Sequence, residues 1–214
     1  MIYKDRQDGG RQLAEKLMKF KDEKPIIIAL PRGGVVTGYE VAKMLNAPLD
    51  IIVTRKLGAP FQPELGIGAI APNDVRILNT DAIRFIGISK DDMEEIIQRE
   101  TKEMYRRIKL YRGDLPPLDL EGKTVIIVDD GLATGVTAGA AVLAINQMTP
   151  EKIILAVPVS PIDTANKFRK EVDEFICLSE PPDFFAVGQY YYDFDQVSDE
   201  EVISLLEIAR KNNI

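Results

Sequence analysis

Five short apolar runs, most of them separated by helical patterns, constrain the fold of this 214-residue chain more than any other feature. They occupy residues 26–30, 50–54, 124–130, 152–158 and 174–178. Runs of Val, Ile and Leu without polar alternation are typical of strands covered on both faces, hence of a parallel sheet. Alternation of such strands with helices indicates βαβ units. We therefore expect an α/β fold with a central parallel sheet flanked by helices.

The composition excludes several kinds of enzyme. Cys177 is the only cysteine and the chain has no histidine, so an internal disulfide, a zinc-type cluster and a Ser-His or Cys-His nucleophile pair are ruled out. A net charge of −7 argues against a protein that coats nucleic acid, because such binding depends on many Lys and Arg contacts to phosphates. The longest apolar runs are far shorter than the roughly 20 residues that cross a bilayer, and the N-terminus lacks an apolar signal region. We expect a cytoplasmic protein that engages neither nucleic acid nor membranes.

The segment that follows Gly58 is longer than a simple βαβ crossover. It opens with a Gly/Pro-rich stretch and continues into a long helix. Along the whole chain, helix-capping patterns begin at Asp8, Ser89, Ser160 and Ser198. The apolar stripe of the long helix favours packing or a dimer contact over a ligand site, and we expect a homodimer. The expected organisation is one domain over 1–214, with a core at about 8–180, a lid and helical insertion at 58–113, and a hood at about 181–214.

The stretch VIIVDDGLATGVTA, residues 125–138, joins an apolar strand, two aspartates and a Gly/Thr-rich turn. A strand that runs through a turn into a helix places backbone N–H groups and the positive end of the helix dipole at the carboxyl edge of the sheet. Gly131 and Gly135 let the backbone approach a ligand closely, and Thr134 and Thr137 add hydroxyl donors. The turn therefore predicts a phosphate site.

Asp129 and Asp130 would repel a phosphate, so beside this turn they are suited to accept hydrogen bonds from sugar hydroxyls or to hold a hard cation such as Mg²⁺. A ribose 5-phosphate carries both kinds of group. The turn is not a Walker loop, which needs a lysine before Ser/Thr, and not the GxGxxG fingerprint, which has no paired aspartates before it. The remaining alternative is an ordinary βα turn with a capping aspartate.

The same stretch resembles the motif with which type I phosphoribosyltransferases bind 5-phosphoribosyl pyrophosphate (PRPP). The resemblance implies the phosphoribosyltransferase fold with its Rossmann-like core, and Mg²⁺ as cofactor. It also implies that Asp129 and Asp130 act as catalytic and metal-binding residues on the ribose hydroxyls. The residues implied around the 5-phosphate are Ala133, Thr134, Gly135, Val136 and Thr137.

Two other strand ends resemble the segments with which this family binds pyrophosphate. LPRGG follows the first predicted strand, and TRK follows the second, where alternation along the chain lets only one of the two basic side chains face the site. The alternatives are a simple Pro-Gly turn and a solvated pair of charges. The implied pyrophosphate-binding residues are Pro31, Arg32, Gly33, Gly34, Arg55 and Lys56.

The stretch from about Gly58 to Asn79 corresponds to the mobile catalytic loop of the family, with Glu64 as an expected catalytic residue. A lid suits the chemistry because water would trap an oxocarbenium ribosyl species. PPDFFAVGQYYYDF resembles the base-binding hood of the hypoxanthine-guanine enzymes, which implies that Phe185 stacks on the base and that Asp193 is a further metal ligand. The hood has one extra residue before Asp193, and its aromatic side chains fit a hydrophobic closure of the core equally well.

Two departures from the hypoxanthine-guanine enzymes argue against those two substrates. Ala133 stands where an aspartate assists at the purine ring, and LAVPVSP lacks the lysine that reads the base carbonyl. The opening YKDRQDGGRQLAEKL and the LPRGG segment look closer to prokaryotic phosphoribosyltransferases whose acceptor is unassigned.

The resemblance implies transfer of phosphoribose from PRPP to a small planar base, with release of pyrophosphate, as in purine or pyrimidine salvage. A PRPP sensor that lost its base site is the main alternative, since the 6-oxopurine determinants are missing. A response-regulator-like doubly wound protein would explain the two aspartates but leaves the TGVT turn without a role.

Overall fold

A computed structural model of the protein describes residues 2–212 and 214, without the side chains of residues 63 and 64. Five parallel strands form the central sheet in the order β2-β1-β6-β7-β8. Each predicted apolar run contributes one of them, so the α/β fold with a central parallel sheet is confirmed. The strands are β1 Ile26–Ala29, β2 Leu49–Ile51, β6 Thr124–Val128, β7 Lys152–Val159 and β8 Glu174–Ser179.

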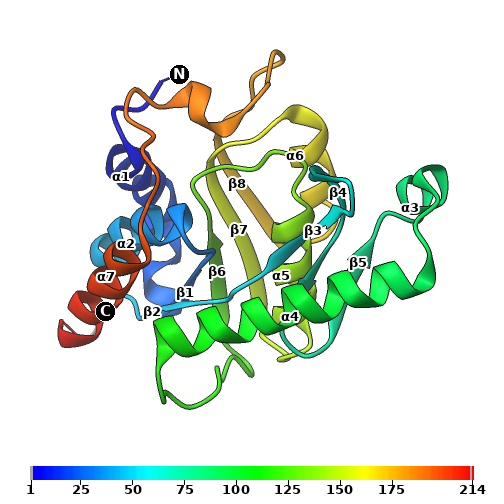
Figure 1. Ribbon diagram of the computed structural model, residues 1–214. Coiled ribbons are helices and arrows are strands. Elements are labelled where there is room, and N and C mark those ends of the chain that lie inside the picture. The colour runs from blue at the N-terminus through cyan, green and yellow to red at the C-terminus, as the bar shows by residue number, and fades with distance from the viewer. Residues whose placement is uncertain (1, 213) are drawn as a thin grey trace.

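Helices cover both faces of this sheet, with α1, α2 and α7 on one side and α5 and α6 on the other (Figure 1). Along β6, Ile126 and Val128 join the core cluster of the first three helices, while Val125 and Ile127 join that of the other two. The strands are therefore apolar on both faces, as buried parallel strands are. The helices are α1 Arg6–Leu17, α2 Gly33–Leu45, α5 Val136–Asn146, α6 Ile162–Phe168 and α7 Asp199–Lys211.

Residues 55–112 form a second layer that lies to one side of the central sheet (Figure 1). Its three strands are antiparallel, in the order β3-β4-β5. The stretch expected as a mobile loop is thus a structured ribbon, with Pro60 and Phe61 at the turn between its first two strands. The elements of this layer are β3 Arg55–Ala59, β4 Gln62–Ala71, β5 Val75–Leu78, α3 Thr80–Ile86 and α4 Lys90–Arg112.

Helix capping follows the sequence at two of four predicted positions. The side chains of Ser89 and Ser198 accept hydrogen bonds from backbone N–H groups in the first turns of α4 and α7. The prediction at Ser160 was wrong, because Pro161 is the N-cap of α6 and no side chain caps that helix. The prediction at Asp8 was wrong, because Asp5 caps α1 and its side chain accepts from the Asp8 N–H. Helix α1 therefore begins earlier than predicted, and Arg6 belongs to its first turn.

The hood folds back onto the N-terminus. The backbone N–H of Tyr3 donates to the carbonyl of Tyr190 at 2.8 Å, and that of Tyr192 donates to the carbonyl of Tyr3 at 2.9 Å. The hood also contains the short helix η2, Val187–Tyr190, and a further short helix η1, Met18–Glu23, follows α1. This pairing brings the start of α1 next to residues 191–195.

None of the helices described is long and apolar enough to cross a membrane.

Candidate active site

The loops that follow β1 and β6 lie in direct contact, because these two strands are neighbours and parallel. A Cβ atom added to Gly33 would lie 2.0 Å from Oδ2 of Asp130, and one added to Gly34 would lie 2.8 Å from Oδ1 of Asp129. Only glycine fits at such distances. The peptide bond between Pro31 and Arg32 in this loop is cis. The structure thus brings the LPRGG segment and the paired aspartates together at one edge of the sheet.

The two aspartates differ in their surroundings. Burial, and then the charge of Asp130, raise the pKa of Asp129 well above its ordinary value. Asp130 is instead held by Arg6, whose Nε donates to Oδ2 of Asp130 at 2.7 Å. The Arg6 side chain is 12% exposed and the Asp130 side chain 15%. The raised pKa means that Asp129 keeps its proton to a higher pH than an ordinary aspartate, while the Arg6 guanidinium lies beside Asp130.

The Gly/Thr-rich turn is fixed by contacts to α6. Gly135 has φ +68°, and a Cβ atom added to it would lie 2.6 Å from the ring of Phe168. Oγ1 of Thr164 donates to the carbonyl of Ala133 at 2.8 Å. Ala133 and Thr134 are exposed. The five residues expected around a 5-phosphate, 133–137, occupy this turn and the start of α5, where helix N–H groups lack intrahelical partners.

Strand register separates the two basic residues of β3. Lys56 opposes Ala69 on β4, which opposes Ile77 on β5, so Lys56 and Ile77 share a face of the antiparallel sheet. A Cβ atom added to Gly139 of α5 would lie 3.3 Å from Cδ1 of Ile77. Lys56 therefore lies on the face that α5 covers, the helix that begins at the candidate phosphate turn.

Arg55 lies on the opposite face, against α4. Its Nε and Nη2 both donate to Oε2 of Glu100, at 2.9 and 2.7 Å, and the Glu100 side chain is 13% exposed. In the LPRGG loop, Nη1 of Arg32 lies 3.7 Å from Oδ1 of Asp199 at the start of α7. Of the two basic residues of β3, the register favours Lys56 as the one that faces the site.

The remaining predicted residues are not gathered into the same cluster. Phe185 is 84% exposed at the rim of the hood, and Asp193 is also exposed, with its N–H donating to the carbonyl of Lys4 at 2.9 Å. Across the described part of the chain, no three acidic or cysteine side chains are arranged to hold a metal ion. Glu64 belongs to β4, and its side chain lies outside the described residues. The roles of these residues stay predictions.

Sequence reasoning missed two residues that contact the acidic pair. Besides Arg6, the hydroxyl of Tyr191 donates to the carbonyl of Asp130 at 2.5 Å. These contacts join positions 124 and 61 residues apart, and no local pattern marks them. Arg6 also lines a cavity of about 220 Å³ together with residues of the hood, Asp193 among them.

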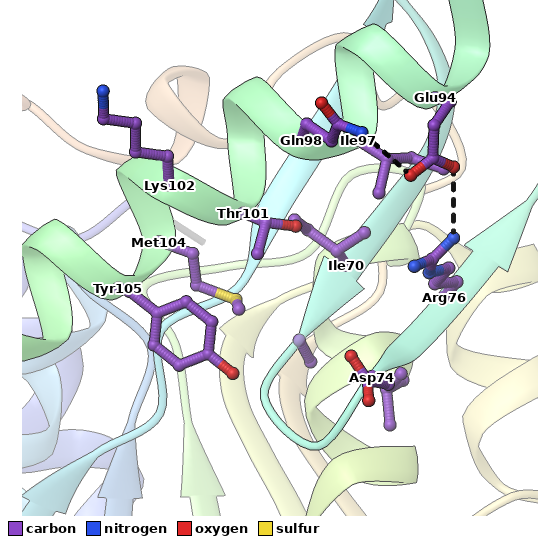
Figure 2. Close-up of a pocket in the computed structure, with 12 residues that line it drawn as sticks. Ile70, Asp74, Arg76, Glu94, Ile97, Gln98, Thr101, Lys102, Met104 and Tyr105 are labelled. Carbon is purple, nitrogen blue, oxygen red and sulfur yellow. Dashed lines mark hydrogen bonds and ion pairs between the residues drawn. The ribbon is translucent and has the colours of Figure 1, made fainter. Parts of the chain in front are cut away.

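A second cavity, of about 300 Å³, lies between α4 and the strands β4 and β5 (Figure 2). Figure 2 shows Arg76 and Glu94 at one end of it, with Nη1 of Arg76 3.7 Å from Oε2 of Glu94. The cavity opens on the α4 face of the antiparallel sheet, and none of the predicted site residues lines it. We therefore place the candidate site at the carboxyl edge of the central sheet and not in this cavity.

Comparison with known proteins identifies the family of the chain. The chain matches the family model of the phosphoribosyl transferase domain over residues 2–195. It is 43% identical over 211 residues to a Mycobacterium tuberculosis protein named "Putative phosphoribosyl transferase Rv0571c", and the alignment covers 99% of this chain and 48% of that protein. The chain thus spans about half the length of this curated relative.

Among solved structures, the fold resembles that of the protein TT1426 from Thermus thermophilus, with a TM-score of 0.79 and 37% identity. That likeness covers 96% of this chain and 98% of the other. The family match spans both loops of the carboxyl edge and the first part of the hood, up to residue 195. The chain therefore belongs to the phosphoribosyl transferase domain family.

Proposed function

We propose that the protein transfers the 5-phosphoribosyl group of PRPP to a nitrogenous acceptor and releases pyrophosphate. The observation that carries this proposal is the contact of the LPRGG loop with the paired aspartates, beside a turn that opens at a helix N-terminus. The loop, the two aspartates and the turn each suit one portion of PRPP, namely the pyrophosphate, the ribose and the 5-phosphate. The membership of the chain in the phosphoribosyl transferase domain family supports the same reaction.

The three portions of PRPP are assigned by chemistry. The N–H groups and hydroxyls of residues 133–137 bind the 5-phosphate. Asp129 and Asp130 accept hydrogen bonds from the ribose hydroxyls. The loop 31–34 and Lys56 bind the pyrophosphate, the loop through its N–H groups and the lysine through its charge.

In the reaction, the bond from C1 of the ribose to pyrophosphate breaks, and a bond from C1 to the acceptor nitrogen forms. The electron pair of the broken bond leaves with the pyrophosphate, so the binding groups at 31–34 stabilise charge that develops on the leaving group. No protein nucleophile is required, which suits a chain without histidine. The segment that bears Glu64 is proposed to cover the site and exclude water.

The donor set fits Mg²⁺, since carboxylate oxygens are the ligands that this cation prefers. Asp129 and Asp130 lie in a cradle that a Cβ atom on Gly33 or Gly34 would fill. We propose that these two aspartates hold Mg²⁺ together with ligand oxygens, and that Asp193 contributes from the hood. The ion would neutralise charge on the pyrophosphate.

The acceptor is proposed to be a small planar nucleobase that stacks on Phe185, in a nucleotide-salvage reaction other than that of hypoxanthine or guanine. We propose that the protein works as a single-domain homodimer in the cytoplasm, with neither nucleic acid nor membranes as partners. Size-exclusion chromatography with light scattering tests the dimer, and a mass near 24 kDa would contradict it.

The test of the reaction is incubation of the protein with PRPP, Mg²⁺ and a mixed pool of purine and pyrimidine bases. The readouts are pyrophosphate release and mass spectrometry of new nucleoside monophosphates. The proposal predicts a product that depends on one base and that is lost in the double variant Asp130→Asn, Thr134→Ala. PRPP binding without pyrophosphate release from any base would support a sensor instead.

A further inference from the structure

Arg6 connects the acidic pair to the hood. Its Nε donates to Oδ2 of Asp130 at 2.7 Å, and its Nη1 donates to the carbonyl of Asp195 at 2.8 Å. Its Cζ lies 3.8 Å from the centre of the Phe194 ring, within the range of a cation–π contact. The Arg6 side chain is only 12% exposed. The guanidinium is therefore held by the hood on one side while it contacts the carboxylate on the other.

Three hydrogen bonds hold Asp130 in place. Its N–H donates to Oδ1 of Asp129 at 2.9 Å, its carbonyl accepts from the Tyr191 hydroxyl at 2.5 Å, and its Oδ2 accepts from Arg6. Gly33 packs against the same Oδ2 atom. Of the two carboxylate oxygens, Oδ2 is thus the one that Arg6 holds and against which Gly33 packs.

We infer that Arg6 is a positioning residue for the phosphoribosyl group, because it holds the Asp130 carboxylate through Oδ2 in the orientation that binds the ribose hydroxyls. The hood segment 191–195 keeps Arg6 in place through the Phe194 ring and the Asp195 carbonyl. This gives the hood a part in binding PRPP, beyond any contact with the base. The inference rests on the proposed function, since it assumes that Asp130 binds the ribose.

An ion pair that merely ties α1 to the loop after β6 would have a different signature. Its loss would lower the unfolding temperature without a selective effect on PRPP. The chain offers a matched control in Arg112, whose side chain is also 12% exposed and which donates to both carboxylate oxygens of Asp50 at 2.9 and 3.0 Å. None of the predicted site residues takes part in that pair.

The test is calorimetric titration of PRPP, with Mg²⁺, into the wild-type protein and the variants Arg6→Gln, Arg6→Lys, Asp130→Asn and Arg6→Gln with Asp130→Asn. We expect Arg6→Gln to weaken PRPP binding about tenfold or more, because a charge-assisted hydrogen bond no longer orients Asp130. Arg6→Lys should recover part of the affinity. The double variant should bind no more weakly than Asp130→Asn alone, because Arg6 acts through Asp130. Arg112→Gln should leave PRPP affinity unchanged.

Two results would overturn the inference while PRPP still binds to the wild type. One is an unchanged affinity in Arg6→Gln, and the other is a double variant that binds more weakly than Asp130→Asn by the full Arg6→Gln factor. If Arg6→Gln does not fold, Phe194→Leu removes the ring under the guanidinium and should weaken PRPP binding several-fold, whereas an unchanged affinity would contradict the inference. Absence of PRPP binding in the wild type would overturn the proposed function itself.

Discussion

Gly33 and Asp130 lie so close that a Cβ atom on the glycine would be 2.0 Å from Oδ2 of the aspartate. This contact joins the LPRGG loop to the acidic pair across two neighbouring strands of the sheet. Any side chain at position 33 must displace either the loop or the carboxylate. The geometry of one half of the site therefore depends directly on the other half.

Gly33→Ala should accordingly lower PRPP affinity at least about tenfold, because the carboxylate and the loop cannot both keep their positions. Calorimetric titration measures the loss. Gly139→Ala is the control, since the added Cβ would meet only the flexible ends of two side chains, Cδ1 of Ile77 at 3.3 Å and Nζ of Lys167 at 3.9 Å. Equal PRPP affinity in Gly33→Ala and the wild type would show that the two loops need not touch.

The neighbours Lys56 and Arg55 should give opposite results on mutation to alanine. Lys56→Ala is expected to raise the KM for PRPP about tenfold, the value of a hydrogen bond to a charged group. Arg55→Ala removes both hydrogen bonds to Oε2 of the largely buried Glu100, which keeps only the contact of Arg99 with Oε1, and should cost about 1–3 kcal/mol of stability. Steady-state kinetics and thermal unfolding of both variants provide the measurements. A KM that rises in Arg55→Ala and not in Lys56→Ala would contradict the assignment of Lys56 to the face that points to the site.

Asp129 should make the ligand-free protein less stable as pH rises. Its pKa is raised in the folded state by burial and by Asp130, so the unfolded chain releases this proton first and is favoured as pH rises above the ordinary carboxyl value of about 4. Asp129→Asn cannot ionise. The unfolding temperature of this variant relative to wild type should therefore climb by about 2–4 °C or more between pH 4 and pH 8.

Differential scanning calorimetry across that range provides the measurement. Glu103 acts in the opposite sense, because hydrogen bonds from Arg106 and Arg107 lower its pKa to about 2, and its stabilisation is lost as pH falls toward that value. That contribution is common to both proteins and cancels in the difference. A difference in unfolding temperature that stays constant with pH would mean that Asp129 is ionised in the folded protein at all these values.

Phe185→Ala should affect the acceptor and spare PRPP. The side chain is 84% exposed, so its removal should change stability by no more than about 0.5 kcal/mol. Loss of a stacking surface is expected to raise the KM for the base several-fold while PRPP affinity stays constant. Steady-state kinetics with the base identified by mass spectrometry decides this, and an unchanged KM would remove Phe185 from the base site.

The sequence predicted the elements whose pattern is local. Unbroken runs of Val, Ile and Leu identified the five parallel strands, and the DDGLATG turn identified the edge at which the candidate site lies. The ribbon β3-β4-β5 was expected as a loop because its Gly and Pro residues are typical of irregular segments, although antiparallel pairing with neighbours stabilises it here.

Long-range contacts set the remaining features. The choice between Arg55 and Lys56 depends on which helix covers which face, and this follows only from strand register. Arg6 was missed because the helix start was predicted too late along the chain and because its partner lies 124 positions away. Such a contact exists only when α1 lies beside the carboxyl edge of the sheet.

The central claim is that PRPP binds at the carboxyl edge, between residues 31–34 and 129–137. The most direct measurement is calorimetric titration of PRPP with Mg²⁺ into the wild-type protein and into the double variant Asp130→Asn, Thr134→Ala. Our account predicts binding of micromolar order in the wild type, about −8 kcal/mol, and a loss of at least about a hundredfold in the variant. Equal affinity in the two proteins, with both shown to be folded, would contradict the assignment of this edge as the PRPP site.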